Sequence, residues 1–595
     1  MGSNRRTFHL PERQPQLIDI IDITDDSDSD ATIDNDPDKG LSIGHNPRRR
    51  DDPEAHTINS AQEGFNQDDY LTDEAYERLI RNWHGNPPEA IPIIDERPAR
   101  RVLDEVCLGG IVYTPGQSFE LYNGTFIRVQ NILQGAAGDV YFNGRRLLRT
   151  EQHLRTYMPK WPNELVWISN ETGDIPFEFV RRIVRIIFTN YCHVDKDSRK
   201  QDRPYDLFCR LKEHVGFHCK DTAALEYVSF DEADEGFRHN PMALRQAWRG
   251  DTRPFGAATS PPVITLDDDQ VTDLTDEGAI NHRQYTFGDG FCGAGGVSCG
   301  ARSAGLRPKW AFDNSPHAVA TYRLNFDDTE CEGSDVFNFL TNDYEFLKVD
   351  VSHGSPPCQT FSPAKTVESA NDDANSACIF SCSDIIRKAR PRVHTMEETS
   401  GLFERHKETM YRVIQDFIET GYSVRWSLLN CVDFGVPQLR KRLVIIASGP
   451  GEKLPPFPKP THGHPSSGLI NYNTIGQAIS RIPEGAQDHD VEYAFERKRN
   501  ARRRAPFDAN QQARTVTCGG GENNYHPSGE RGFTNREFAC LQTFPVRYRF
   551  GAREVRKQIG NAVPPKLAEA MYRAIKESLR QTDEKEMRAA RVISR

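Results

Sequence analysis

Long apolar runs and paired metal-binding cysteines are both lacking from this sequence of 595 residues. No apolar run reaches the roughly 18 residues that a membrane span needs, and the N terminus has no apolar signal core. The 13 cysteines are scattered without CxxC spacing, and the closest two, Cys378 and Cys382, have no second pair to complete a metal site. We therefore expect an intracellular protein with reduced thiols, no membrane segment and no metal ion.

Positive charge is scarce in the chain as a whole, whose net charge is −11. Residues 1–75 hold 18 acidic and 7 basic side chains, whereas residues 497–595 hold 22 basic and 10 acidic ones. The charge is therefore segregated, with a basic C-terminal part that can face phosphate groups. The alternative is an ordinary solvated surface.

Apolar and aromatic residues are also scarce in residues 1–75, which predicts a disordered acidic tail. Within it, residues 17–24 form a β-branched run followed by acids, and residues 263–269 repeat the pattern. Such a run can add as a strand to the edge of a partner's sheet. Both segments resemble SUMO-interacting motifs, although short patterns of this kind also arise by chance.

Residues 100–250 have the pattern of a mainly β domain, a small barrel or sandwich, and residues 251–280 that of a linker. Short β-rich runs alternate with Gly, Asn and Pro. The phrases at residues 144–149, 163–168 and 184–191 resemble bromo-adjacent homology (BAH) domains. The resemblance implies a chromatin or interaction module, and the alternative is a structural β domain without a ligand.

From Tyr285 onward strands and helices alternate, which indicates a parallel α/β sheet. The loop at residues 289–296 reads DGFCGAGG. This DxFxGxGG form differs from the GxGxxG of a dinucleotide site and suits a nucleoside without a pyrophosphate. Asp313, after the next strand, is placed to hold ribose hydroxyls, and Asp335 to accept a hydrogen bond from an adenine amino group. Each acid taken alone is more often a turn residue.

A cysteine on a stiff loop follows. Residues 346–351 read as a buried strand, and residues 354–362 (GSPPCQTFS) place Cys358 on the loop at its end. Loops on a rigid scaffold concentrate catalytic groups, so this thiol is a candidate nucleophile. The alternative is a small apolar cysteine in a turn.

Four further segments complete the pattern. A short strand delivers Glu397 to the carboxyl edge of the sheet, and in residues 438–442 (QLRKR) alternation puts Gln438, Arg440 and Arg442 on one face. Residues 534–542 begin with a capping box, and residues 558–565 (QIGNAVPP) precede the last helix.

In this order, the segments resemble DNA (cytosine-5) methyltransferases from Tyr285 to about residue 575. The resemblance implies an α/β, Rossmann-like, S-adenosylmethionine-dependent methyltransferase domain at residues 281–443 and 533–580. A target-recognition region at residues 444–532 and a basic tail at 581–595 complete this arrangement.

The resemblance also implies roles for individual residues. As a thiolate, Cys358 would add to C6 of a flipped cytosine while Glu397 engages N3 and Arg442 acts with Arg440. The cofactor-binding residues would be Phe291, Gly293, Gly295, Gly296, Asp313, Asn314, Asp335, Pro357, Asn561 and Val563. The DNA-binding residues would be Gln359, Ser362, Gln438, Arg497, Lys498, Arg499, Arg502, Arg503 and Arg504.

One segment departs from the family, because Glu-Asn-Val is replaced by Glu397-Glu398-Thr399. This change is similar to the fungal RID-type enzymes, which carry a BAH-like domain and are associated with silencing of repeats. The resemblance implies a nuclear enzyme that methylates double-stranded DNA de novo, with chromatin as a partner. The two β-branched runs add SUMO-modified proteins as expected partners, and the oligomeric state is left open, with a homodimer as one arrangement that would span paired duplexes. The alternatives are an inactive DNA-binding regulator with the same fold and an RNA methyltransferase.

Overall fold

The structure is a computed structural model that describes residues 100–149, 157–158, 161, 163–171, 173–192, 207–216, 222–250, 284–357, 378–499, 505–518 and 525–593. The predicted acidic tail, the linker and both segments that resemble SUMO-interacting motifs lie outside the described residues. The described residues all belong to one unit, residues 93–595. A search of their helices for one with the length and apolar character to cross a bilayer finds none.

The parallel sheet predicted after Tyr285 is confirmed. Its five parallel strands lie in the order β15-β14-β13-β16-β17, and antiparallel β20 joins β17 to β18. The bounds are β13 (Thr286–Gly290), β14 (Arg307–Phe312), β15 (Glu330–Glu332), β16 (Val351–Gly354), β17 (Val393–Thr399), β18 (Ser423–Asn430) and β20 (Lys441–Ser448).

Helices cover both faces of this sheet, which explains why its strands are apolar runs. One core joins β17 and β18 to α8 and α10, and a second joins β13 and β17 to α3 and α15. The helices before β18 are α3 (Gly296–Ser303), α4 (Pro316–Asn325), α5 (Val336–Phe339), α6 (Tyr344–Leu347), α8 (Ser381–Ala389), α9 (Ser400–Arg405) and α10 (Lys407–Glu419).

The C-terminal part adds short helices, small strands and one long helix. These are β19 (Gln438–Leu439), β21 (His462–Gly463), β22 (Ile470–Asn471), α11 (Ile475–Ile479), α12 (Val491–Arg499), β23 (Ala513–Arg514), α13 (Asn535–Leu541), α14 (Val555–Asn561) and α15 (Pro565–Ile593). The capping box is confirmed, since the side chains of Thr534 and Glu537 each accept from the other's backbone N–H.

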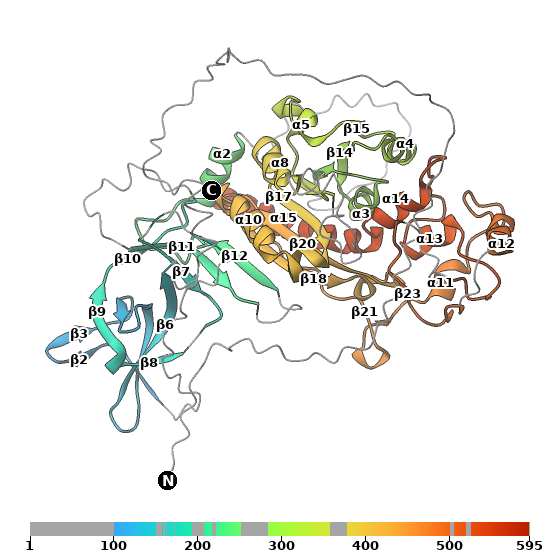
Figure 1. The fold of residues 1–595 in the computed structure, drawn as a ribbon. Coiled ribbons are helices and arrows are strands. Elements are labelled where there is room, and N and C mark those ends of the chain that lie inside the picture. Colours follow the sequence, from blue (N-terminus) through green and yellow to red (C-terminus); the bar gives the residue numbers. More distant parts are fainter. Residues whose placement is uncertain are drawn as a thin grey trace, which may run out of the picture. The chain divides into compact units, whose positions relative to one another are not determined.

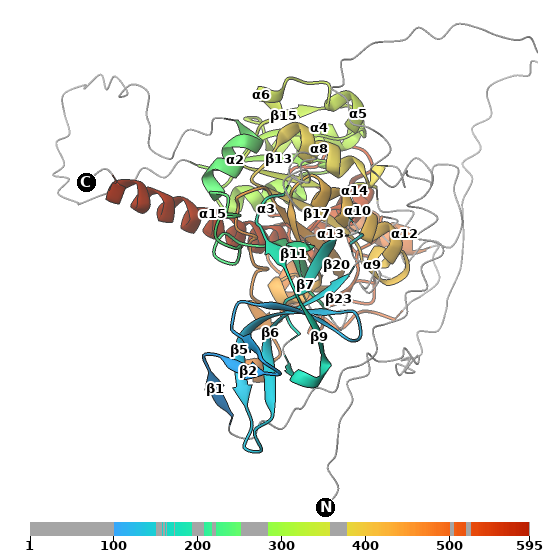
Figure 2. The same cartoon turned by 90° about the vertical axis from the view of Figure 1, so that its left-hand side faces the viewer.

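Three predicted boundaries move. The run at residues 346–351 is not a strand, because Asp343 caps the helical turn α6 and the strand is β16. Residues 444–448 belong to β20 in the central sheet and not to the target-recognition region. Residues 581–593 are the end of α15, which Figure 2 shows as one continuous helix, and not a tail.

The predicted mainly β region is confirmed, with twelve strands and one helix among its described residues. They are β1 (Arg101–Leu103), β2 (Val106–Leu108), β3 (Ile111–Tyr113), β4 (Ser118–Leu121), β5 (Phe126–Gln134), β6 (Val140–Arg149), β7 (Glu164–Ile168), β8 (Asp174–Pro176), β9 (Val180–Val184), β10 (Ile186–Phe188), β11 (Leu207–His214), β12 (Ala223–Tyr227) and α2 (Pro241–Arg249).

This β region is continuous with the central sheet. Strand β12 pairs antiparallel with β18, side by side in Figure 1. Helix α2 adds a second connection, because its Arg245 binds Glu586 of α15 at 2.9 Å and Glu452 after β20 at 2.6 Å. Arg392, at the start of β17, also binds Glu452, at 2.6 Å. Buried charges paired in this way hold the two regions together.

Candidate active site

The carboxyl ends of four neighbouring strands are aligned. Gly290 of β13 lies opposite both Phe312 of β14 and Gly354 of β16, and Gly354 lies opposite Met396 of β17. The next residues along these strands, Phe291, Asp313, Ser355 and Glu397, therefore gather at one edge. Open α/β sheets bind their ligands at this edge.

Glu397 is held at this edge by two side chains. Its Oε1 lies 2.6 Å from Nε of Arg442 on β20, which lies opposite Thr399 in the sheet. Its Oε2 accepts a hydrogen bond from Oγ of Ser355 at 3.2 Å. Glu397 is 7% exposed, so the pair lies in a largely desolvated position where electrostatic contacts are strong. The structure thus brings together two of the predicted catalytic residues.

The neighbouring Glu398 lies on the other face of β17. It is 1% exposed, and its Oε2 accepts from the N–H of Thr399 at 3.0 Å. Its Oε1 has no hydrogen-bond partner among the described residues. Burial, and then the charge of Glu397, raise the pKa of Glu398 well above its ordinary value. This position, where the family resemblance leads us to expect an asparagine, therefore favours a neutral carboxyl group.

The glycine loop leaves open backbone beside Asp313. Gly293 has a φ of +52°, and a Cβ placed there would meet nothing within 4 Å. Its N–H donates to Asp313 Oδ2 at 2.9 Å, and the N–H of Ser315 donates to Oδ1 at 2.8 Å. Phe291 has a φ of +57°, rare for a bulky residue, and its ring contacts Phe312 at 5.2 Å. Strained backbone held in this way is typical of ligand-binding positions.

Gly295 and Gly296 lie close against other parts of the protein, and Val563 is part of the contact; the role predicted for these three residues at the cofactor stays a prediction. A Cβ on Gly295 would lie 2.7 Å from the ring of Phe326, and one on Gly296 would lie 2.3 Å from the carbonyl oxygen of Val563. These two glycines therefore allow the loop to approach α4 and the start of α15. The sequence pattern alone cannot separate glycines that face a ligand from glycines that face protein.

The structure gives the exposure or the contacts of four other predicted cofactor residues. Asp335 is exposed and caps α5, accepting from the N–H of Asn338 at 2.9 Å. Asn314 is exposed after β14, and Pro357 ends the described part of the loop after β16. Asn561, the last residue of α14, accepts a hydrogen bond from the thiol of Cys518.

Arg440 and Gln438 are both turned away from Glu397, so their predicted roles need correction. The guanidinium of Arg440 donates to the carbonyl oxygens of Val516, Gly560 and Ala562 at 3.0–3.2 Å. Gln438 is 0% exposed, donates to the carbonyl oxygen of Leu541 and the side chain of Gln542, and accepts from Val516 N–H. Arg440 is therefore a structural residue, and Gln438 does not reach DNA.

The alternate residues of the same segment form an exposed rim that the sequence analysis did not select. Leu439 is 61% exposed, Lys441 is exposed, and Arg514 lies opposite Leu439 in the β19–β23 pair. Lys441 directly precedes Arg442, so this rim adjoins the Glu397 site. The signal was available, because Leu439 and Lys441 alternate with the two residues selected.

The remaining predicted site residues lie outside the described part of the chain. These are Cys358, Gln359, Ser362, Arg502, Arg503 and Arg504, together with the side chains of Arg497, Lys498 and Arg499, whose backbone ends α12.

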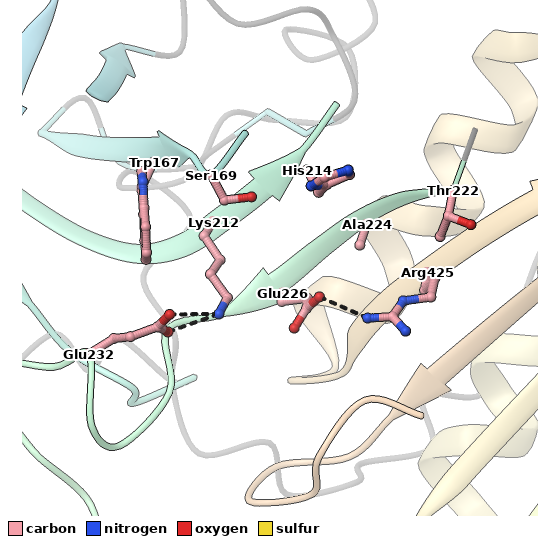
Figure 3. A pocket seen from close by; sticks show the side chains of 9 residues that line it. All are labelled: Trp167, Ser169, Lys212, His214, Thr222, Ala224, Glu226, Glu232 and Arg425. Atoms are coloured by element: carbon pink, nitrogen blue, oxygen red, sulfur yellow. Dashed lines mark hydrogen bonds and ion pairs between the residues drawn. The ribbon is translucent and has the colours of Figure 1, made fainter. Parts of the chain in front are cut away.

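A cavity of about 410 Å³ lies elsewhere, on the strands that join the β region to the central sheet (Figure 3). Lys212 binds Glu232 at 2.9 Å and Arg425 binds Glu226 at 3.3 Å across its wall. The cavity is separate from the candidate site. Its residue Arg425 is four residues, or roughly 13 Å along β18, from Leu429, which lies opposite Arg442. Because its charges are already paired, this cavity is a poor candidate for the reaction site.

Comparison with known proteins assigns the site. The family model described as C-5 cytosine-specific DNA methylase matches residues 285–501 and 471–577. The Type II methyltransferase M1.HphI of Haemophilus parahaemolyticus is 31% identical over 329 residues, which are 49% of this chain and 86% of the relative. This chain belongs to the C-5 cytosine-specific DNA methylase family. M.NgoFVII of Neisseria gonorrhoeae is 32% identical over 46% of this chain and 82% of its own length.

Among solved structures, the Dnmt2 methyltransferase of S. pombe covers 50% of this chain and 99% of its own, at 15% identity and a TM-score of 0.38. Family membership makes the chain a DNA methyltransferase whose methyl donor is S-adenosylmethionine. The open backbone at Gly293, the fixed carboxylate of Asp313 and the strained Phe291 fit the nucleoside part of this donor.

Proposed function

We propose that this member of the C-5 cytosine-specific DNA methylase family methylates C5 of a cytosine flipped out of duplex DNA, with Cys358 as its nucleophile. The observation that carries the proposal is the pairing of Glu397 with Arg442 at 2.6 Å, at the edge where the loop of Cys358 begins. The Ser355 hydroxyl that contacts Glu397 lies only three residues before Cys358 in the sequence.

The residues divide the chemistry as follows. The thiolate of Cys358 forms a bond to C6 as N3 takes up a proton, and the carboxylate of Glu397 accepts a hydrogen bond from this N3–H, so that no net negative charge builds up on the ring; N3 releases the proton when the double bond is restored. S-adenosylmethionine, held beside Phe291, Gly293 and Asp313, supplies the methyl group. C5 then loses its proton to a base, the C6–sulfur bond breaks, and the ring double bond is restored. Arg442 neutralises Glu397 and keeps its carboxylate facing the ring.

The exposed rim of Leu439, Lys441 and Arg514 is proposed to face the duplex. Cations in such a position contact phosphates, and an apolar side chain between them can fill space left by a flipped base. We therefore propose these three exposed residues as DNA contacts, and no longer the buried Gln438.

We also propose the finer role that the RID-type resemblance implies: de novo methylation of repeated DNA in the nucleus. The Glu397-Glu398-Thr399 sequence and the BAH-like phrases of the β region support it. In this proposal the β region contacts chromatin, and residues 17–24 and 263–269 contact SUMO-modified proteins. A homodimer that spans paired duplexes belongs to the same proposal.

Transfer of a labelled methyl group from S-adenosylmethionine to duplex DNA tests the main proposal. We expect the wild type to label duplex cytosine and to form a trapped adduct with a 5-fluorocytosine duplex, and Cys358→Ala to do neither. Normal DNA affinity without label or adduct would instead identify a non-catalytic regulator. Preferential labelling of an RNA of the same sequence would identify an RNA substrate.

A further inference from the structure

A line of hydrogen-bonded side chains runs from Glu397 into the sheet. Oγ of Ser355 lies 3.2 Å from Glu397 Oε2 and 2.7 Å from Nε2 of His353. The other ring nitrogen, Nδ1, lies 2.8 Å from Oγ1 of Thr395, which lies 2.9 Å from the hydroxyl of Tyr572. His353, Thr395 and Tyr572 are buried, so beyond the half-buried Ser355 the line connects the carboxylate to α15 through the interior of the protein.

The donors in this line have one consistent direction. A carboxylate paired with Arg442 only accepts, so Ser355 donates to it and must itself accept from Nε2–H of His353. Burial lowers the pKa of His353 to about 3, which keeps the ring neutral with a single proton. Nδ1 then accepts from Thr395, and Thr395 accepts from Tyr572. In this arrangement the hydroxyls of Tyr572, Thr395 and Ser355 are directed toward Glu397, and the carbonyl oxygen of Ser352, 3.4 Å from Thr395 Oγ1, is a second and longer acceptor for Thr395.

We propose that Ser355 is a positioning residue for methyl transfer: supported by His353, Thr395 and Tyr572, it orients Glu397 and ties it to the root of the Cys358 loop. This inference rests on the proposed function. Arg442 holds one carboxylate oxygen and Ser355 holds the other, which prevents rotation of the group. The N–H of Ser355 also donates to the carbonyl oxygen of Gly290 at 3.3 Å, so one residue links β13, β17 and the nucleophile loop.

The line holds Glu397 but does not deliver protons to it. Burial raises the pKa of Tyr572, at its far end, well above the ordinary value, so Tyr572 has no proton to release near neutral pH. A relay would need a source beyond this hydroxyl. Loss of Ser355 therefore changes the position and charge stability of the carboxylate, and these are measurable separately from folding.

Other titratable groups that face Glu397 or the line must be distinguished from it. They are Arg442 on β20, Cys431 after β18, Asp289 near Tyr572 and, on the opposite face of the sheet, Glu398 and His394, whose charges act on the line through the sheet. Burial raises the pKa of the Cys431 thiol to about 11 and that of Asp289 to about 7, and it lowers that of His394 to about 3. Each of these groups is retained in the variants below.

The test is the pH profile of kcat/KM for methyl transfer by the full chain to duplex DNA. Ser355→Ala should lower kcat/KM about 10- to 100-fold at pH 7, because a hydrogen bond to a charged group is lost. It should move the acidic limb of the profile upward by about one pH unit, since that bond favours the charged form. Ser355→Thr keeps the hydroxyl and should restore both.

Ser352→Ala is the matched control. Ser352 lies on β16, three residues before Ser355, and is more deeply buried; its Oγ lies 2.8 Å from Nδ1 of His394 on the opposite face of the sheet. The acidic limb of the pH profile of Ser352→Ala should coincide with that of the wild type. An unshifted limb in Ser355→Ala, or an equal shift in Ser352→Ala, would overturn the inference.

Tyr572→Phe decides the question if Ser355→Ala does not fold. It removes only the last hydroxyl and should move the limb in the same direction by a smaller amount; a wild-type limb would count against the inference. A wild type that transfers no methyl group refutes the proposed function itself. A Ser355→Ala enzyme with the wild-type profile refutes only the positioning role.

Discussion

Glu397 and Glu398 are adjacent on β17, yet their carboxyl groups lie on opposite faces of the central sheet. Glu397 contacts Arg442 at 2.6 Å, whereas Glu398 accepts from the backbone of Thr399. The negative charge of Glu397 nevertheless raises the pKa of Glu398, adding to the larger effect of burial.

Glu398→Gln should stabilise the protein relative to the wild type, and this advantage should grow as pH rises. The pKa of Glu398 is raised in the folded state, so its favourable contribution is present at acidic pH and is lost as pH rises above the unfolded value of about 4.3. Glutamine has no proton to lose. In denaturant titrations at pH 5, 6.5 and 8, the advantage of the variant should grow by up to about 1.4 kcal/mol per pH unit. A difference independent of pH would contradict this account.

Arg442→Gln and Arg440→Gln should fail in different ways. Arg442→Gln removes the charge beside Glu397 and should lower kcat about 100- to 1000-fold in the folded enzyme; it should also lower the unfolding free energy, because it leaves the largely buried carboxylate of Glu397 unpaired. Arg440→Gln removes the donors of three carbonyl groups in the interior and should cost about 3–5 kcal/mol of stability. Single-turnover transfer and denaturant unfolding, measured on both proteins, separate the two roles. The same pattern in both variants would show that the division is mistaken.

Lys441→Ala and Arg514→Ala should weaken binding to duplex DNA with little sequence dependence. Each phosphate contact that is lost should reduce the slope of log affinity against log salt by about 0.9. Arg307→Ala is the control, because Arg307 is exposed at the start of β14, at the opposite end of the strands. Fluorescence anisotropy over a salt series gives the slopes. Unchanged slopes in both rim variants would place the duplex elsewhere.

Gly293→Ala and Gly296→Ala should separate a glycine that faces the cofactor from one that faces protein. At Gly296 the added Cβ would lie 2.3 Å from the carbonyl oxygen of Val563, so we expect a loss of about 1–3 kcal/mol of stability. At Gly293 there is space, and the strained φ should cost only about 1–2 kcal/mol. Calorimetry with S-adenosylmethionine should nevertheless show a tenfold or greater loss of affinity for Gly293→Ala. Full affinity in that variant would remove Gly293 from the cofactor site.

Local patterns in the sequence predicted much of the fold. The capping box at Thr534, the strand that carries Glu397 and the glycine loop all depend on residues close together in the chain, and each is present. The strand predicted at residues 346–351 failed because the cap at Asp343 outweighs the apolar run that follows it. The boundary at residue 444 failed because a strand's sheet is decided by its pairing partners.

By itself the sequence determined which chemical groups are present and in what order, since these follow from residue types and spacing. Only the tertiary structure decided where each group points. Gln438 and Arg440 turn inward because β19 pairs with β23 and meets α13 and α14, whereas Arg442 meets Glu397 because β20 pairs with β17. Such pairings join residues far apart in the chain, so no alternation rule over five neighbouring residues contains them.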